Sequence, residues 1–301
     1  MIMKDEKLRS HMAASLASLM ICILVLSTLT ACRNETTEDS ERLIEINLES
    51  EILHKNMQLL IWLPQDMTED QKYPVLYFLP DYGGSAYTVI NEYEIGKAAD
   101  ELTRQNQIDS MIIVAVSMDR SFGINSSANV QKIETESGKT LSEGPYEDYF
   151  IQEVIPLIDT RFSTQTTRSG RMIGGYSMGG FAALYLAFHH PELFCRVGGH
   201  SATLFSGDLP DQSVTDWLYP DEVTRDSRDP IRLAQNSELD GLAVYLDTGD
   251  TDPNLEGNAL LAEVLQNKQV PCENHVFQGV HGRSFCQMWM KEYLLFYGTS
   301  P

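Results

Sequence analysis

Residues 171–180 read Arg-Met-Ile-Gly-Gly-Tyr-Ser-Met-Gly-Gly, and the Gly-x-Ser-x-Gly pattern within them decides the fold. The apolar residues before the pattern predict the end of a strand, and residues 181–188 predict a helix. Such a strand-to-helix turn lifts a serine hydroxyl clear of its neighbours, and glycines tolerate the crowding on either side. The segment therefore predicts a nucleophile elbow with Ser177 as the nucleophile. The alternative is a Gly-rich turn whose serine only caps the helix.

Three carboxylates follow the predicted buried strand residues 241–246, namely Asp247, Asp250 and Asp252. An acid in a strand-end loop can orient an imidazole, and one of the three is expected to cap the helix that starts near Asn254. The spacing of Asp250, Asp252 and Asn254 also suggests a calcium loop, but the glycine and glutamate of that motif are missing. The sequence predicts no metal site.

His281 lies in a glycine-flanked loop after the last predicted strand. Serine, acid and histidine then occur in the chain order of α/β-hydrolases, which predicts His281 as the base. The other histidines lack this setting. His189 and His190 stand beside a proline at a helix end and indicate a turn, whereas His200 follows an apolar strand and is expected to be structural.

An ester-cleaving serine also needs two amides to bind the oxyanion. One is the backbone N–H after the nucleophile, that of Met178. The second is expected in the Gly-rich loop at residues 80–85, which follows a predicted strand at 75–79.

The chain resembles the putative-esterase (esterase D-like) family of α/β-hydrolases over about residues 45–298. That family includes feruloyl and acetyl-xylan esterases, S-formylglutathione hydrolases, siderophore esterases and mycolyltransferases. The matching stretches are residues 74–85, 146–159, 174–180, 190–194, 247–252 and 279–281. The resemblance implies a serine esterase without a cofactor.

Carried over by position, the resemblance implies Ser177 as nucleophile, His281 as base and Asp252 as the acid. It also implies Tyr82 as the second oxyanion amide. This chain has Pro80-Asp81 where the family usually has His-Gly or Asp-Gly. Because a carboxylate pointing at an oxyanion would oppose catalysis, Asp81 is expected to face away.

Alternating strands and helices predict an α/β-hydrolase fold with a mostly parallel, doubly wound sheet of about eight strands and an antiparallel start. Predicted strands cover residues 41–48, 55–63, 74–79, 111–117, 171–176, 194–200, 242–247 and 272–278, and predicted helices cover 86–105, 147–159, 178–189, 255–267 and 284–297. Residues 118–145 lack periodicity and are expected to border the pocket. Residues 203–236 are expected to form a second insert that acts as a small lid.

The N-terminus predicts a targeting segment. Residues 1–31 combine a basic start with a long apolar run and end before Cys32 in a lipobox-like Leu-Thr-Ala-Cys sequence. This predicts a lipoprotein signal peptide over 1–31, lipid on Cys32, a polar tether over 32–42 and one catalytic domain over 43–301. An uncleaved membrane anchor is the alternative. Either prediction places the enzyme outside the cytoplasmic membrane of a bacterium, with the membrane contacted only through its anchor.

The chain carries a formal net charge of −21. Residues 1–31 hold three cations and two anions, so the remainder stands at −22. Such a surface repels nucleic acid, which is excluded as a partner. Cys195 is expected to pack in the core, while a bond between Cys272 and Cys286 stays open, as does the oligomeric state.

The predicted function is therefore an extracytoplasmic serine esterase that hydrolyses carboxylic esters through an acyl-enzyme. The resemblance favours acyl groups on carbohydrates or siderophore-like molecules as substrates. An acyltransferase with the same triad and a non-catalytic binding protein with the same fold are the alternatives.

Overall fold

The computed structural model describes residues 42–68, 70–205 and 212–299. The chain divides into two units, Met1–Leu43 and Ile44–Pro301, and the second carries the fold. The predicted signal peptide, Cys32 and all but the last residue of the predicted tether lie outside the described residues. Within the described residues, no helix combines the length and apolar character needed to cross a membrane.

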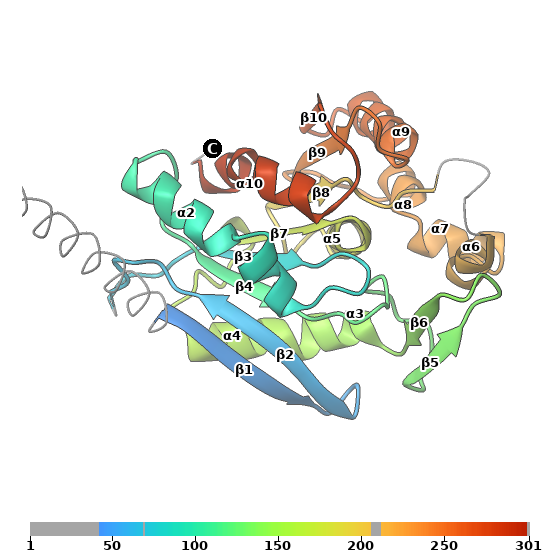
Figure 1. Ribbon diagram of the computed structural model, residues 1–301, viewed down its shortest axis with the longest axis horizontal. Helices are drawn as coiled ribbons and strands as arrows, with labels where there is room; N and C mark the ends of the chain where they lie inside the picture. The colour runs from blue at the N-terminus through green and yellow to red at the C-terminus, as the bar shows by residue number, and fades with distance from the viewer. Residues whose placement is uncertain (1–41, 69, 206–211, 300–301) are drawn as a thin grey trace, which may run out of the picture. The chain divides into compact units, whose positions relative to one another are not determined.

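A sheet of eight strands forms the centre of the second unit, in the order β1-β2-β4-β3-β7-β8-β9-β10 (Figure 1). Neighbouring strands from β4 to β10 are parallel, and β2 runs antiparallel to β4, which confirms the predicted sheet. The central strands are continuous apolar runs buried on both faces, as parallel sheets require. The strands are β1 (Leu43–Ser50), β2 (Lys55–Trp62), β3 (Val75–Leu79), β4 (Ile112–Val116), β7 (Arg171–Tyr176), β8 (Arg196–His200), β9 (Ala243–Gly249) and β10 (Cys272–Phe277).

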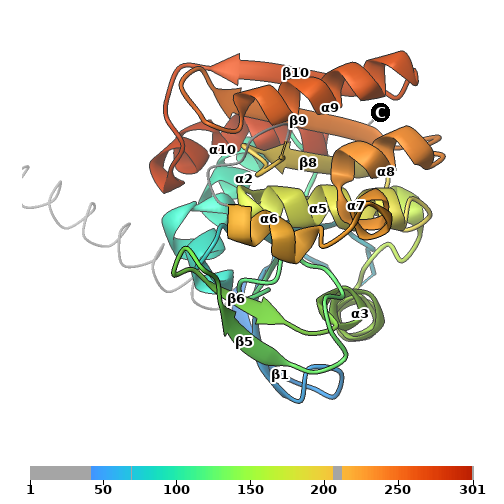
Figure 2. The same ribbon diagram turned by 90° about the vertical axis from the view of Figure 1, so that its right-hand side faces the viewer.

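Helices cover both faces of this sheet (Figures 1 and 2). On one face, α2 (Ile95–Arg104) packs against α10 (Arg283–Gly298). On the other, α5 (Met178–His189) lies next to α8 (Pro230–Asn236), which packs on α9 (Leu255–Asn267). Because α5 is apolar all round, it is buried along almost its whole length and forms the centre of that layer.

Two predicted helices prove to be composite. Residues 86–105 form a π-helical turn, η1 (Thr88–Glu92), and then α2, because Glu94 adopts a left-handed conformation with φ 54° between them. Residues 146–161 form one run of α3 (Tyr146–Asp148), a π-helical segment η2 (Tyr149–Val154) and α4 (Ile155–Arg161). A short 3₁₀ turn, η3 (Arg168–Gly170), leads into β7.

Both inserts contain regular structure that the sequence analysis missed. The first holds an antiparallel hairpin of β5 (Gln131–Glu134) and β6 (Thr140–Glu143), whose turn uses Gly138 at φ 79°. The second holds α6 (Gln212–Leu218) and α7 (Glu222–Arg228) before α8. Trp217 Nε1 donates to Glu143 Oε1 at 3.0 Å, so the two inserts are in contact.

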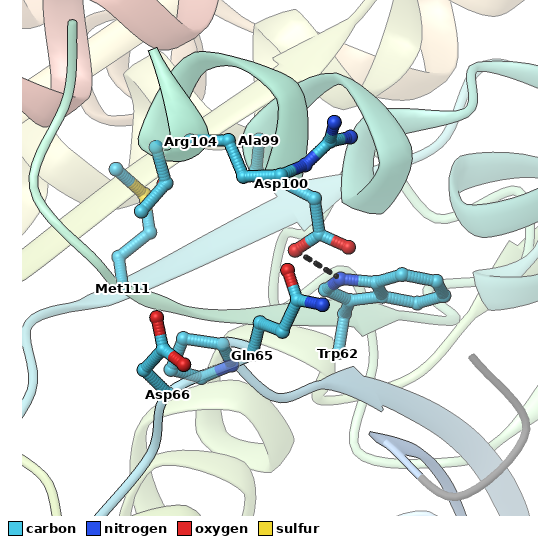
Figure 3. Close-up of a pocket in the computed structure, with 9 residues that line it drawn as sticks. Trp62, Gln65, Asp66, Ala99, Asp100, Arg104 and Met111 are labelled. Carbon is cyan, nitrogen blue, oxygen red and sulfur yellow. Dashed lines mark hydrogen bonds between the residues drawn. The ribbon is translucent and has the colours of Figure 1, made fainter. Parts of the chain in front are cut away.

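A cavity of about 50 Å³ lies where β2 ends beside α2 (Figure 3). Trp62 Nε1 donates to Asp100 Oδ1 at 3.3 Å across it, and Met111, just before β4, also lines it. Since Met111 stands at the amino end of β4, this cavity is at the sheet edge opposite the one where Ser177 follows β7.

Candidate active site

The Gly-x-Ser-x-Gly segment forms the predicted strand–turn–helix. Ser177 stands between β7 and α5 with φ 59° and ψ −116°, a conformation that costs a non-glycine residue free energy. A Cβ on Gly179 would lie 2.3 Å from the carbonyl oxygen of Leu79, so only glycine fits there. The Ser177 N–H donates to the carbonyl of His200 at 2.8 Å, which ties the turn to β8. The local backbone thus holds Ser177 in its strained conformation.

The structure brings Ser177, His281 and Asp252 into one hydrogen-bonded chain. His281 Nε2 lies 2.9 Å from Ser177 Oγ, and His281 Nδ1 lies 2.9 Å from Asp252 Oδ2. The three residues follow β7, β10 and β9, so they meet at the carboxyl edge of the sheet. The Asp252 side chain is fully buried, whereas that of His281 is 29% exposed and can exchange protons with solvent.

The three carboxylates after β9 have separate partners. Asp247 lies inside β9, which extends two residues beyond the predicted strand, and its carboxylate accepts hydrogen bonds from His200 at 2.7 Å and Tyr293 at 2.8 Å. Asp250 Oδ1 accepts the N–H of Gly279 at 3.0 Å. Only Asp252 of the three contacts His281. Asp250 and Asp252, the two carboxylates of the calcium alternative, thus bond to different groups.

Asp252 is held in its charged form. Burial alone would raise its pKa, but hydrogen bonds from His281 and from the backbone N–H of Asn254, at 2.8 Å, outweigh that effect and lower the pKa below the ordinary value of 3.8. A negative charge at this position favours the tautomer of His281 that carries its proton on Nδ1. The Nε2 lone pair is then directed at Ser177 Oγ.

Tyr176 positions the histidine, a role that the sequence analysis did not predict. Its ring stacks on His281 with centroids 5.2 Å apart and 24° between planes, and its hydroxyl accepts the N–H of Gly282 at 2.9 Å. Thr203 was also missed, and its Oγ1 lies 3.2 Å from Ser177 Oγ. Tyr176 is the variable residue before the serine of the motif, and Thr203 lies in an insert. Neither carried a signal in a single sequence.

The predicted oxyanion amides, those of Tyr82 and Met178, border the same cavity as Ser177. Neither N–H donates to another group among the described residues, so both are available to a ligand. The Tyr82 side chain is fixed from outside the loop. Its hydroxyl donates to the carbonyl of Thr140 at 2.8 Å, and the Arg120 guanidinium lies over its ring at 5.2 Å.

The Asp81 carboxylate is held by two other side chains, in line with the expectation that it does not point at the oxyanion. Its Oδ1 accepts the hydroxyl of Tyr93 at 2.9 Å, and its Oδ2 accepts Arg283 Nε at 2.9 Å. In α10, Trp289 stacks on Phe277 of β10 with centroids 3.9 Å apart.

A cavity of about 200 Å³ opens beside Ser177, and its walls are mainly apolar. The first insert, the oxyanion loop and the second insert all contribute to it, which agrees with the expected pocket border. The lining residues are Tyr82, Phe122, Lys139, Leu141, Ser177, Met178, Thr203, Phe205 and Val214.

The three cysteines within the described residues are free, so the Cys272–Cys286 bond that the sequence left open does not form. Cys195 precedes β8 and is half-buried, which corrects its expected place in the core. In the described part of the chain, one group of residues could supply several metal ligands: Glu147, His189 and His190. Their atoms already hydrogen-bond to one another, at the end of α5 remote from Ser177.

Comparison with known proteins places this geometry in context. The family model described as "Putative esterase" matches residues 50–294. An endo-1,4-beta-xylanase/feruloyl esterase of Xylanibacter ruminicola is 26% identical over 148 residues, which is 49% of this chain and only 18% of that protein.

Solved structures share the fold over most of their length. A ferulic acid esterase superposes with a TM-score of 0.70 and 22% identity, covering 85% of this chain and 97% of that one. The fluorophosphonate-binding serine hydrolase F of Staphylococcus aureus superposes with a TM-score of 0.68 and 18% identity, covering 86% of this chain and 98% of that one. The enterobactin esterase of Shigella flexneri superposes with a TM-score of 0.63 and 18% identity, covering 84% of this chain and 58% of that one.

Proposed function

The chain belongs to the putative-esterase family and is a serine hydrolase of the carboxylesterase type, and from that premise we propose its catalytic residues and substrates. Ser177 is the nucleophile, His281 the general base and Asp252 the acid that orients it. The amides of Tyr82 and Met178 form the oxyanion hole. The observation that carries this proposal is the continuous hydrogen-bonded chain from Asp252 through His281 to a strained serine beside an apolar cavity.

In the first half-reaction, His281 Nε2 takes the proton of Ser177 as Oγ attacks the carbonyl carbon of the ester. The carbonyl oxygen becomes an oxyanion, and two backbone N–H groups stabilise it. When the tetrahedral intermediate collapses, the bond to the alcohol oxygen breaks and His281 donates its proton to that oxygen. The products are a free alcohol and an acyl-enzyme.

In the second half-reaction, His281 takes a proton from water, whose oxygen attacks the acyl carbon. Collapse of this second intermediate returns the proton to Ser177 Oγ and releases the carboxylic acid. Asp252 stays ionised throughout and stabilises the positively charged imidazole, in agreement with the hydrogen bonds that lower its pKa.

The cavity supports a substrate whose acyl group is mainly apolar. Three aromatic side chains line it, those of Tyr82, Phe122 and Phe205, and its volume of about 200 Å³ suits an aromatic or medium-chain acyl group. The feruloyl esterase named among the relatives supports esters on carbohydrate, and the enterobactin esterase supports siderophore-like esters. We place the enzyme outside the cytoplasmic membrane, anchored through lipid on Cys32, because of the lipobox-like sequence before that residue.

A fluorophosphonate probe tests the nucleophile. The purified protein is expected to form a single adduct at Ser177 and to hydrolyse p-nitrophenyl acetate. Ser177→Ala should lose the adduct and several orders of magnitude in rate, whereas the matched variant Ser169→Ala, at the opposite end of β7, should keep both. Turnover that survives in Ser177→Ala would overturn the mechanism.

Lipid labelling tests the location separately. In a bacterial host, the full chain should incorporate labelled palmitate and fractionate with membranes, and Cys32→Ser should lose the label. A wild-type chain that stays unlabelled in the cytoplasm would refute the location while leaving the chemistry intact.

A further inference from the structure

Arg283 connects two loops of the candidate site that lie 202 residues apart in the chain. It is the first residue of α10, two positions after His281, and its Nε donates to Asp81 Oδ2 in the oxyanion loop at 2.9 Å. Its Nη1 donates to both carboxylate oxygens of Glu92, at 2.8 and 3.0 Å. The guanidinium thus has two carboxylate partners, Asp81 and Glu92, with charge-assisted hydrogen bonds to each.

Asp81 is in turn anchored to the core through Tyr93. The Tyr93 hydroxyl donates to Asp81 Oδ1 at 2.9 Å and accepts the Asp81 backbone N–H at 3.1 Å. Tyr93 is fully buried, and its ring meets that of Tyr176 edge to face at 6.0 Å. Asp81 therefore cannot turn without breaking contacts to a rigid aromatic side chain.

These contacts form a closed circuit that includes the loop of His281 and the oxyanion loop. Tyr176 stacks on His281 and accepts the N–H of Gly282, the residue before Arg283. Arg283 in turn pairs with Asp81. Asp81 is bonded to Tyr93, whose ring contacts that of Tyr176. The Tyr82 amide directly follows Asp81. The Asp81–Arg283 ion pair thus links the residue before that amide to the loop that carries His281.

We propose that the Asp81–Arg283 pair, together with Tyr93, positions the oxyanion loop against the histidine loop and neutralises the Asp81 charge beside the oxyanion hole. This role rests on the proposed function. Arg283 is a positioning residue, since it touches neither Ser177 nor His281 Nε2. It explains how the chain accommodates Pro80-Asp81, where related sequences were expected to have His-Gly or Asp-Gly.

Arg283→Gln should lower kcat and kcat/KM for p-nitrophenyl acetate together, by about 10- to 100-fold, because an oxyanion donor displaced by about 1 Å loses that much transition-state stabilisation. The matched control is Lys291→Gln, which removes another ion pair of α10, to Glu101 of α2, without touching either loop. Its kinetics should stay within about twofold of wild type, as exposed pairs contribute little.

The double variant Asp81→Asn, Arg283→Gln separates charge from architecture. In Arg283→Gln the Asp81 carboxylate keeps its charge near the developing oxyanion without a counterion, so removing that charge should restore part of the rate. A purely structural role predicts that the double variant is as slow as Arg283→Gln or slower, and that result would overturn the charge-neutralising role.

Amide hydrogen exchange gives a readout that does not need activity. Residues 80–85 should exchange faster in Arg283→Gln than in wild type and in Lys291→Gln, at temperatures where thermal unfolding shows all three folded. Unchanged exchange of this loop would overturn the positioning role even if the chain hydrolysed no ester. Faster exchange with unchanged kcat would show that the pair holds the loop without serving catalysis, which also overturns the proposal.

Discussion

Tyr176 stacks on His281, with ring centroids 5.2 Å apart. The two residues are distant in the chain, since Ser177, which follows Tyr176, precedes His281 by 104 positions. The residue before the nucleophile therefore also orients the base. Its hydroxyl accepts the N–H of Gly282, so it fixes both the ring of the histidine and the loop that carries it. The elbow thus determines the position of two of the three members of the hydrogen-bonded chain.

Tyr176→Phe should lower kcat by about 5- to 20-fold while the protein stays folded, because the stack persists but the Gly282 N–H loses its acceptor and the loop gains freedom. Steady-state kinetics with p-nitrophenyl acetate checks this. Tyr149→Phe is the control, since its buried hydroxyl has no partner among the described residues. Equal losses in the two variants would contradict a specific role for the Gly282 contact.

The sequence predicted those parts of the fold and site that local sequence patterns mark. The strands are apolar runs between turns, and the elbow is a motif with its own backbone conformation, so both were predictable. The break at Glu94 was not predictable, because this left-handed position is not occupied by glycine, the residue that usually marks such a conformation. The hairpin of β5 and β6 is short and polar, and pairing rather than hydrophobic alternation defines it.

The acid shows the same limit more sharply. Three aspartates within six residues look equivalent in sequence, and the family resemblance selected Asp252. The structure separates them because β9 continues to Gly249, which leaves Asp247 inside a strand and facing the core. Tertiary contacts, such as those of Tyr176 and Arg283, join loops that are distant in the chain and leave no local pattern to detect.

Asp252→Asn should reduce kcat about 10⁴-fold with little change in stability, because an amide cannot hold the imidazole in the required tautomer or stabilise its charged form. Asp250→Asn is the matched control and should cost less than about tenfold, since among the described residues the Asp250 carboxylate accepts a hydrogen bond only from the Gly279 N–H. The kcat values are measured with active sites counted by fluorophosphonate titration. Comparable losses of kcat in both variants would show that Asp252 is not the acid of the triad.

Asp247→Ala should instead act on stability. Asp247 and His200 are fully buried and bonded at 2.7 Å, and His200 Nε2 also lies 2.9 Å from the Tyr297 hydroxyl. Removing one partner leaves the others without their hydrogen bonds, which is expected to cost about 3–5 kcal/mol in urea unfolding. Asp240→Ala, at an exposed position, is the control. A cost below about 1 kcal/mol for Asp247→Ala would contradict a structural role for this buried network.

Glu147 is buried at the end of α5, where its carboxylate accepts hydrogen bonds from His189, His190 and Tyr185 at 2.6 to 2.7 Å. Burial acts to raise the pKa of Glu147, but these three donors outweigh it and lower the pKa from 4.5 to about 2. The hydrogen bond with Glu147 in turn raises the pKa of His190 above its ordinary 6.5. The two pKa shifts arise from the same interaction, so their contributions to stability are not additive.

The sign follows from comparing folded with unfolded chains. A carboxylate whose pKa falls on folding contributes stability that is complete above about pH 4.5 and disappears as the pH drops toward 2. A histidine whose pKa rises on folding contributes stability that is complete below about pH 6.5 and disappears as the pH passes its folded value. Glu147→Gln should therefore destabilise the protein most between about pH 4.5 and 6.5, and less toward pH 3 or pH 9. Urea unfolding across this range checks it against Glu101→Gln, whose surface carboxylate accepts hydrogen bonds from Lys291 and Gln105. A loss of stability in Glu147→Gln that is the same at every pH would show that Glu147 stabilises α5 by packing and not by charge.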